Sequence, residues 1–203
     1  MTTQKSARRK GLYNYPKKIG KILEEWYYPE YMPNSKGKIL YPTIGSGSFG
    51  KKRPDLSAQR GDLCPIDKWT KKKPWTICLE LKHRMEWSFE QVIQKPNSNF
   101  LFNYWDQVYE DSIDKVTGTE KYLPLLIVTK NYGKDYVLFA KDSWKCLSKL
   151  RNPMTLSNEE GRKLGVMLLK DFIEHASVDN IIAEVKEKRK ALREYKKELK
   201  NGS

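Results

Sequence analysis

The sequence predicts an α/β or α+β fold with a mixed central β-sheet flanked by helices. One observation is the order of the predicted elements, which is a helix, two or three strands, a second helix and two further strands. The other is the supply of core residues: 203 residues, 38% of them hydrophobic, with six Trp and twelve Tyr. A chain of this length and composition can bury the core of one domain with extensions.

The N-terminal half contains one clear amphipathic segment. Apolar residues at Ile19, Ile22, Leu23 and Trp26 have helical spacing and predict a helix over 17–28 that ends before Pro29. The basic residues before it, 1–16, are predicted to form an N-terminal arm. Residues 30–60 are rich in Gly, Pro and Ser and predict loops with a short strand at 38–41.

The remaining elements follow from hydrophobic pattern and turn residues. Strands are predicted at 62–66, 75–82, 124–131 and 135–140, and helices at 87–94, 99–116, 155–176 and 178–200. The helix over 155–176 has Ser157 as its expected N-cap, with Glu160 three residues later. We therefore divide the chain into the arm, a core over 17–150 and a C-terminal helical extension over 151–203.

The charge indicates a polyanionic partner. The chain has 39 Lys and Arg against 25 Asp and Glu, a formal charge of +14, as expected for a protein that binds nucleic acid. No run approaches the ~18 apolar residues of a membrane span, and the N-terminus lacks the apolar stretch of a secretory signal. The three cysteines are widely spaced, which argues against a disulfide framework and favours a reducing cytoplasm.

Two strand segments carry the most informative residues. In the run 75–82, alternate side chains face opposite sides, so Ile77, Leu79 and Leu81 can enter a core while Glu80 and Lys82 share the other face. A hairpin through 67–74 can bring Asp62 alongside them. Two carboxylates supply the hard oxygen ligands that Mg²⁺ prefers, and a lysine can orient or activate a water. The alternative is that Glu80 and Lys82 form only the solvent face of an amphipathic strand.

The glycine-rich run 45–50 resembles two nucleotide-binding loops but fits neither. A P-loop needs Ser or Thr where Lys52 stands, and no kinase catalytic motif follows. The run, which includes Ser48 as a possible additional site residue, can still let phosphate approach backbone amides, or it is a flexible connector. The basic residues expected to contact nucleic acid follow it: Lys51, Lys52, Arg53 and Arg60. His83 and His175 are isolated and are predicted to be surface residues.

The ordered motifs GSGSFG, RGD at 60–62, ICLELK at 77–82, EWSFEQ, YWDQ at 104–107 and PLLIVTKN resemble those of the PD-(D/E)XK nuclease superfamily. They are most similar to small phage and archaeal nucleases that include Holliday junction resolvases. The resemblance covers about residues 17–140 and implies a restriction-endonuclease-like core. It departs at a literal Pro54-Asp55, but we prefer Asp62 because Asp62 opens an apolar run.

The resemblance also implies roles for individual residues. It implies that Asp62 and Glu80 are metal ligands, completed by the Leu81 carbonyl, that Lys82 is the catalytic lysine, and that Gln107 assists it. Such families often carry a Glu on the first helix, for which Glu24 and Glu25 are the candidates.

These observations together predict a Mg²⁺-dependent endodeoxyribonuclease, for which Mn²⁺ can substitute, acting on branched or recombination intermediates. We expect a phage or mobile-element origin, and activity in the cytoplasm of a bacterium or a phage-infected host cell. We also expect a homodimer, formed through 25–32 or the interrupted heptads of 178–199, since two opposed cuts need two sites. The alternatives are a restriction- or repair-type duplex nuclease, and a DNA-binding protein that keeps the fold without cleavage.

Overall fold

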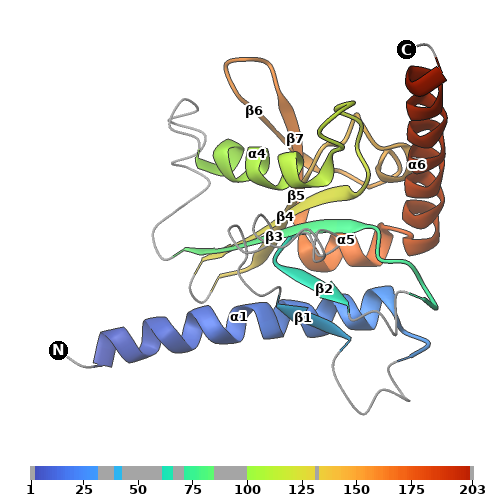
Figure 1. The fold of residues 1–203 in the computed structure, drawn as a ribbon. Coiled ribbons are helices and arrows are strands. Elements are labelled where there is room, and N and C mark those ends of the chain that lie inside the picture. Colours follow the sequence, from blue (N-terminus) through green and yellow to red (C-terminus); the bar gives the residue numbers. More distant parts are fainter. Residues whose placement is uncertain are drawn as a thin grey trace.

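The computed structural model describes residues 3–31, 39–42, 61–65, 71–84, 100–130 and 133–201. Its centre is a five-stranded sheet in the order β3-β4-β5-β7-β6 (Figure 1). The strands are β3 (Ile77–Arg84), β4 (Leu123–Lys130), β5 (Asp135–Phe139), β6 (Met154–Ser157) and β7 (Lys163–Leu168). The β3–β4 pair is parallel and the other pairs are antiparallel, so the predicted mixed sheet is confirmed.

Helices cover both faces of this sheet. Helices α1 (Thr3–Tyr27) and α5 (Leu169–His175) lie on one face and α4 (Phe100–Ser112) lies on the other (Figure 1). A 3₁₀ turn, η4 (Lys145–Leu147), and the long helix α6 (Val178–Asn201) complete the larger elements. A separate pair of short antiparallel strands, β1 (Leu40–Pro42) and β2 (Leu63–Pro65), lies beside α1. None of the helices in the described ranges is long and apolar enough to cross a membrane.

The alternation of side chains along β3 explains how the sheet separates two apolar cores. Ile77, Leu79 and Leu81 are buried in the core on the α1 and α5 side, as predicted. Cys78 points the other way and is buried beneath α4 with Trp105. Because α4 covers this second face, the polar residues that follow Cys78 on β3 are not on an open solvent surface.

The first helix is longer than its apolar pattern predicts. It begins at Thr3, inside the segment expected to be a separate arm, and contains Pro16. Proline has the φ angle of a helix and removes one N–H, so it does not always end a helix that packs against a sheet. The helix ends at Tyr27, before Pro29 as predicted. Its buried stripe of Ile19, Leu23 and Tyr27 faces the sheet.

The aromatic segment over 25–32 was predicted to offer a dimer surface, but two of its three tyrosines are not available for one. Tyr27 and Tyr28 are fully buried. The Tyr27 hydroxyl donates to the Pro74 carbonyl at 2.6 Å and lies 2.8 Å from Thr76 Oγ1. These tyrosines therefore connect α1 to the residues that precede β3, and belong to the core.

The predicted helix over 155–176 was also wrong. Residues 154–168 form the β6–β7 hairpin, and only the last part of the segment is helical, as α5. The hairpin turns at Asn158 to Gly161, where Gly161 has φ +77° and the Arg162 N–H donates to Asn158 Oδ1 at 2.9 Å. Gly favours this left-handed conformation. The division at residue 150 stays a prediction, but the segment beyond it is not wholly helical.

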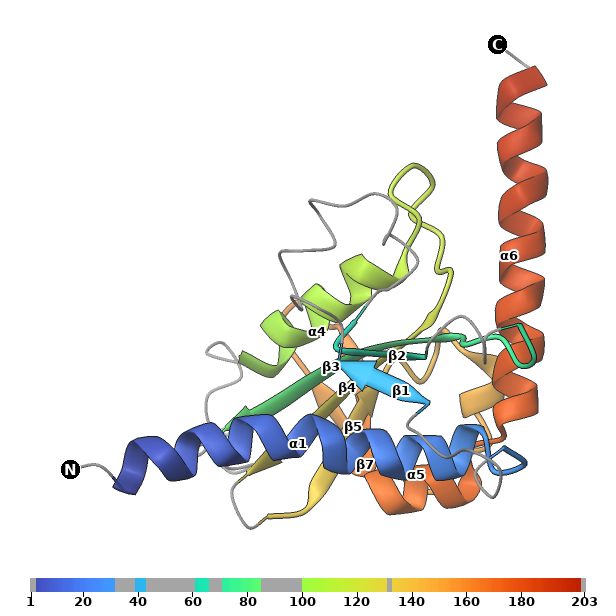
Figure 2. The same cartoon turned by 60° about the horizontal axis from the view of Figure 1, so that its bottom comes forward.

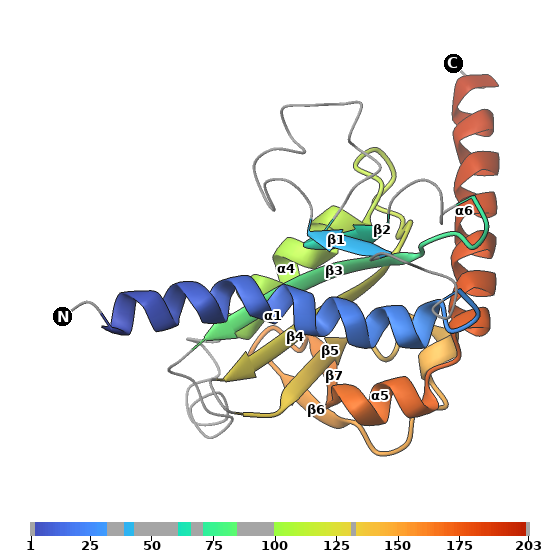
Figure 3. The same cartoon turned by 90° about the horizontal axis from the view of Figure 1, so that it is seen from below.

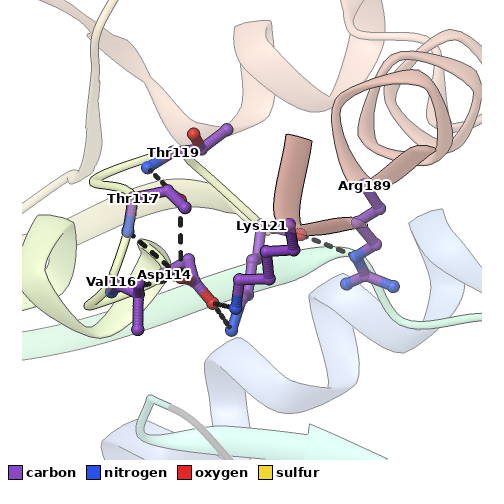
Figure 4. Close-up of polar contacts among 7 residues, drawn as sticks. Asp114, Val116, Thr117, Thr119, Lys121 and Arg189 are labelled. Atoms are coloured by element: carbon purple, nitrogen blue, oxygen red, sulfur yellow. Dashed lines mark hydrogen bonds and ion pairs between the residues drawn. The ribbon is translucent and has the colours of Figure 1, made fainter. Parts of the chain in front are cut away.

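The C-terminal helix is held to the α4–β4 connection by polar contacts around Asp114 and Lys121 (Figure 4). Asp114 in that connection is buried and accepts from Lys121 at 2.5 Å and from Lys196 of α6 at 2.7 Å. It also accepts from the backbone N–H groups of Val116 and Thr117. The lysines and these hydrogen bonds hold the pKa of Asp114 well below its usual range.

The long charged helix over 178–200 is thus confirmed, and its apolar positions divide into two groups. Ile181, Val185 and Leu192 are buried against the rest of the protein. Tyr195 and Leu199 are 51% and 46% exposed, and the C-terminal turns of α6 project beyond the sheet (Figure 2). The first part of the helix is therefore a packed surface helix, as its single apolar stripe predicts.

Candidate active site

Asp62 lies against the edge of β3 that does not face β4. The Asp62 N–H donates to the Leu79 carbonyl at 2.6 Å, and the Leu81 N–H donates to Asp62 Oδ2 at 2.7 Å. The predicted placement of Asp62 beside the Glu-x-Lys strand is therefore confirmed. It does not depend on a regular hairpin, because β2 pairs with β1.

Gly61 makes this close approach possible. It has φ +81°, and a Cβ at this position would lie 2.4 Å from the Leu79 oxygen. A side chain would therefore clash with the β3 backbone as well as strain the turn. The Gly-Asp pair of the sequence is thus a local requirement for holding the Asp62 carboxylate at the strand edge.

Glu80 and Lys82 lie on the face of β3 that α4 covers. Glu80 is 4% exposed, and its Oε1 forms an ion pair with the Lys82 ammonium group. Lys82 Nζ lies 3.4 Å from Gln107 Oε1 and 4.7 Å from the centroid of the Tyr104 ring. The structure thus brings Glu80, Lys82 and Gln107 together as the sequence predicts.

The electrostatics of the site favour a cation. Burial, followed by the charge of Asp62, raises the pKa of Glu80 to about 7, although the hydrogen bond and charge of Lys82 act in the opposite direction. A carboxyl with this pKa is only partly ionised at neutral pH. Bringing a positive charge next to Asp62 and Glu80 would favour the ionised form of both carboxylates.

The available donors fit a hard divalent ion such as Mg²⁺. Asp62 and Glu80 supply carboxylate oxygens. Because Leu79 and Leu81 both direct backbone groups towards Asp62, the Leu81 carbonyl faces the same edge of β3. No cluster of three or more acidic, His or Cys side chains suited to a metal occurs among the described residues. An ion here would thus take two carboxylates and one carbonyl from these elements, and water for its other ligands.

Sequence reasoning missed two α4 residues of this site. Tyr104 packs on the Lys82 ammonium group, and the charge of Asp111 contributes to the raised pKa of Glu80. Tyr104, Gln107 and Asp111 are three and four residues apart, which places them on one face of a helix. That spacing could have predicted that the three side chains share a face, but the apolar stripe of the same helix was the stronger pattern.

The candidate acids of the first helix have partners of their own. Glu24 is buried, and its Oε1 accepts from the backbone N–H groups of Ile39 and Leu40 at 2.8 and 2.6 Å. Glu25 is exposed and lies 3.9 Å from Lys21. These contacts give Glu24 a structural partner at the start of β1, and Glu25 lies on the exposed side of α1.

His83, predicted to be a surface residue, is partly buried. Its ring packs against Tyr15 with centroids 5.2 Å apart. Several other predicted residues fall outside the described residues: Ser48, Lys51, Lys52, Arg53, Asp55, Arg60 and the helix over 87–94.

A mixed sheet whose edge strand carries Glu-x-Lys, with an Asp held against that edge, is the arrangement of the PD-(D/E)XK nuclease superfamily. A family model described as "Phage putative PDDEXK endonuclease" matches residues 6–187, and the chain belongs to that family. No curated protein and no solved structure matches the chain. The description of that family names phage PDDEXK endonucleases.

Proposed function

We propose that the protein is a Mg²⁺-dependent endodeoxyribonuclease that hydrolyses DNA phosphodiester bonds. The observation that carries this proposal is the convergence of Asp62, Glu80, Lys82 and Gln107 at the β3 edge, through the contacts Leu81 N–H to Asp62, Lys82 to Glu80 and Lys82 to Gln107. Membership of a phage PDDEXK endonuclease family supports it.

Each residue has a distinct role in this proposal. Asp62, Glu80 and the Leu81 carbonyl would hold the divalent ion, which would polarise the scissile phosphate; Mn²⁺ can substitute for Mg²⁺. Lys82 holds and orients the attacking water. Gln107 and the Tyr104 ring keep the Lys82 ammonium group at the site. Because Lys82 is partly exposed, water and substrate can reach it.

DNA is the proposed partner, because the formal charge of +14 matches a polyanion. Lys17, Lys18 and Lys21 are exposed on α1, the helix that packs beside β1 and β3. We assign the contacts to the phosphate backbone to these lysines together with Lys51, Lys52, Arg53 and Arg60.

We further propose that the substrate is a branched or recombination intermediate and that the enzyme acts as a homodimer, in the cytoplasm of an infected bacterium. A Holliday junction resolvase cuts two opposed strands, which calls for two sites related by a two-fold axis. The exposed Tyr195 and Leu199, four residues apart on α6, provide an apolar surface for a second copy.

A plasmid nicking assay with Mg²⁺, Mn²⁺ or EDTA tests the chemistry. Glu80→Gln and Lys82→Ala should each lower cleavage by orders of magnitude while DNA affinity changes little, because affinity depends on the basic surface. Glu174→Gln and Lys170→Ala, two exposed residues of α5, are matched controls and should cut as the wild type does. DNA binding by the wild type without cleavage in any metal would favour a non-catalytic DNA-binding protein.

A cleavage panel tests the substrate. The panel contains a four-way junction, a flap, single-stranded DNA and linear duplex, and the proposal expects the junction to be cut fastest. Preferential cutting of linear duplex would favour the restriction- or repair-type alternative. Light scattering at micromolar concentration should show a dimer, and a strict monomer with and without DNA would refute the junction-resolving version.

A further inference from the structure

Two neighbouring strands determine where Asp62 lies. Its backbone N–H and its carboxylate are hydrogen-bonded to Leu79 and Leu81 of β3. The residue that follows it, Leu63, is the first residue of β2. Among the described strands, β2 pairs with β1 and with no strand of the five-stranded sheet. The position of Asp62 therefore depends on the β1–β2 pair as well as on β3.

The β1–β2 pair needs support from another element. Each of its strands has three residues, and an isolated two-stranded ribbon is marginally stable at best in water. Helix α1 contacts β1 and β3 and runs past them in Figure 3. It also reaches β2: Leu63 is buried, and a Cβ on Gly20 of α1 would lie 3.7 Å from Leu63 Cδ1. Helix α1 therefore supplies the support that two such short strands require.

The polar part of this support comes from Glu24. It lies one turn after Gly20, on the same side of α1, and is buried. Its Oε1 accepts from the N–H groups of Ile39 and Leu40 at 2.8 and 2.6 Å, and hydrogen bonds to a carboxylate are roughly twice as strong as those between neutral groups. Leu40 is the first residue of β1 and the register partner of Pro65 in β2. One carboxylate oxygen thus holds the strand with which β2 pairs.

We propose that Glu24 is a positioning residue of the nuclease site, which holds β1 on α1 and, through the β1–β2 pair, keeps Asp62 at the β3 edge. This inference rests on the proposed function, because it assumes that Asp62 binds a divalent ion. Loss of a residue that orients a metal ligand typically lowers metal affinity about 10–100-fold. The acid of the first helix then acts on the metal site through the backbone of β1 and β2, and is not itself a metal ligand.

The test compares Glu24→Leu with Glu184→Leu, using the full chain. Glu184 of α6 is the matched control, because its carboxylate also accepts from two successive backbone N–H groups, those of Lys145 and Cys146 in η4, at 2.9 and 2.7 Å. Both changes remove these acceptors and should lower the melting temperature. Only Glu24→Leu should also weaken Mn²⁺ binding, about tenfold by calorimetry. In the nicking assay, excess Mn²⁺ should restore the rate of Glu24→Leu, which a general loss of stability would not allow.

Two further variants separate positioning from direct metal ligation. Glu24→Gln keeps an oxygen that can accept from both N–H groups but removes the charge, so it should bind Mn²⁺ more tightly than Glu24→Leu does. Equal weakening in these two variants would mean that Glu24 is itself a ligand, and would overturn the proposal. If Glu24→Leu does not fold, Glu24→Asp takes its place, because its carboxylate is one methylene shorter and should hold β1 less well, again with weaker Mn²⁺ binding.

The outcomes separate this inference from the proposed function. Wild-type Mn²⁺ affinity in Glu24→Leu, or in Glu24→Asp where that variant replaces it, would overturn the role of Glu24 while leaving the nuclease proposal intact. Wild-type protein that binds Mn²⁺ without cutting DNA would contradict the nuclease proposal, and a weakened Glu24→Leu would still support the link to Asp62. Absence of Mn²⁺ binding by the wild type would overturn both.

Discussion

Replacing Asp114 should loosen α6 from the rest of the protein. In Asp114→Asn the side chain keeps its shape and can still accept from the turn backbone. It loses its charge opposite Lys121 (Figure 4) and opposite Lys196. Breaking a fully buried ion pair costs about 3–5 kcal/mol. The two lysine side chains are 29% and 38% exposed, so they can be rehydrated, and we expect a smaller loss of about 2 kcal/mol.

A short series separates the charge of Asp114 from its turn hydrogen bonds. Asp114→Ala also removes the acceptor of the Val116 and Thr117 N–H groups, and should cost about 1 kcal/mol more than Asp114→Asn. Glu194→Gln is the matched control, because Glu194 pairs with Lys190 on the surface of the same helix at 4.0 Å. It should change stability by less than about 0.5 kcal/mol.

Urea unfolding at pH 7, followed by circular dichroism, measures these differences. Since the pKa of Asp114 is lowered by folding, its stabilisation is present above the unfolded value of about 4 and is lost as the pH falls below it. The gap between wild type and Asp114→Asn should therefore narrow at acid pH. An Asp114→Asn protein within about 0.5 kcal/mol of the wild type at pH 7 would refute the role of these ion pairs.

Three further predictions concern the site and its partner. In EDTA, Glu80→Gln should stabilise the protein above pH 7 by up to about 3 kcal/mol. The reason is that folding raises the pKa of Glu80 from 4.5 to about 7, so the wild type loses stability as the pH rises between these values. Identical melting curves for both proteins at pH 5 and pH 8.5 would contradict this. Gly61→Ala should abolish Mn²⁺ binding, measured by calorimetry, because it displaces Asp62. The control Gly118→Ala, at φ +68° but with open space around the added Cβ, should only lower stability. Equal Mn²⁺ affinity of the two variants would show that the close approach of Gly61 to the β3 backbone is not required. DNA affinity should fall with a log–log salt slope near −5 if about six phosphates are neutralised, and a flat slope in gel-shift titrations would mean that the +14 charge serves another purpose.

The sequence by itself determined the elements whose side chains alternate or repeat locally. The alternation in ICLELK predicted both β3 and the opposite faces of Leu81 and Lys82, because strand geometry depends on neighbouring residues alone. The apolar stripes of α4 and α6 predicted these helices for the same reason. The Gly61-Asp62 pair could be recognised as part of an ordered set of motifs, although the need for glycine there came from the nearby β3 backbone.

Only the tertiary structure decided how these elements meet. The β6–β7 hairpin was not predicted because Ser157 and Glu160 have the spacing of a helix capping signal, whereas the hairpin depends on pairing with β5. The burial of Glu80 depends on α4, and the contact between Tyr15 and His83 depends on α1 crossing the other face of the sheet. Burial and charge coupling are properties of residues distant in the chain. The sequence therefore predicted Asp62, Glu80 and Lys82 as site residues, while the fold determined which of them lie together in a low-dielectric site.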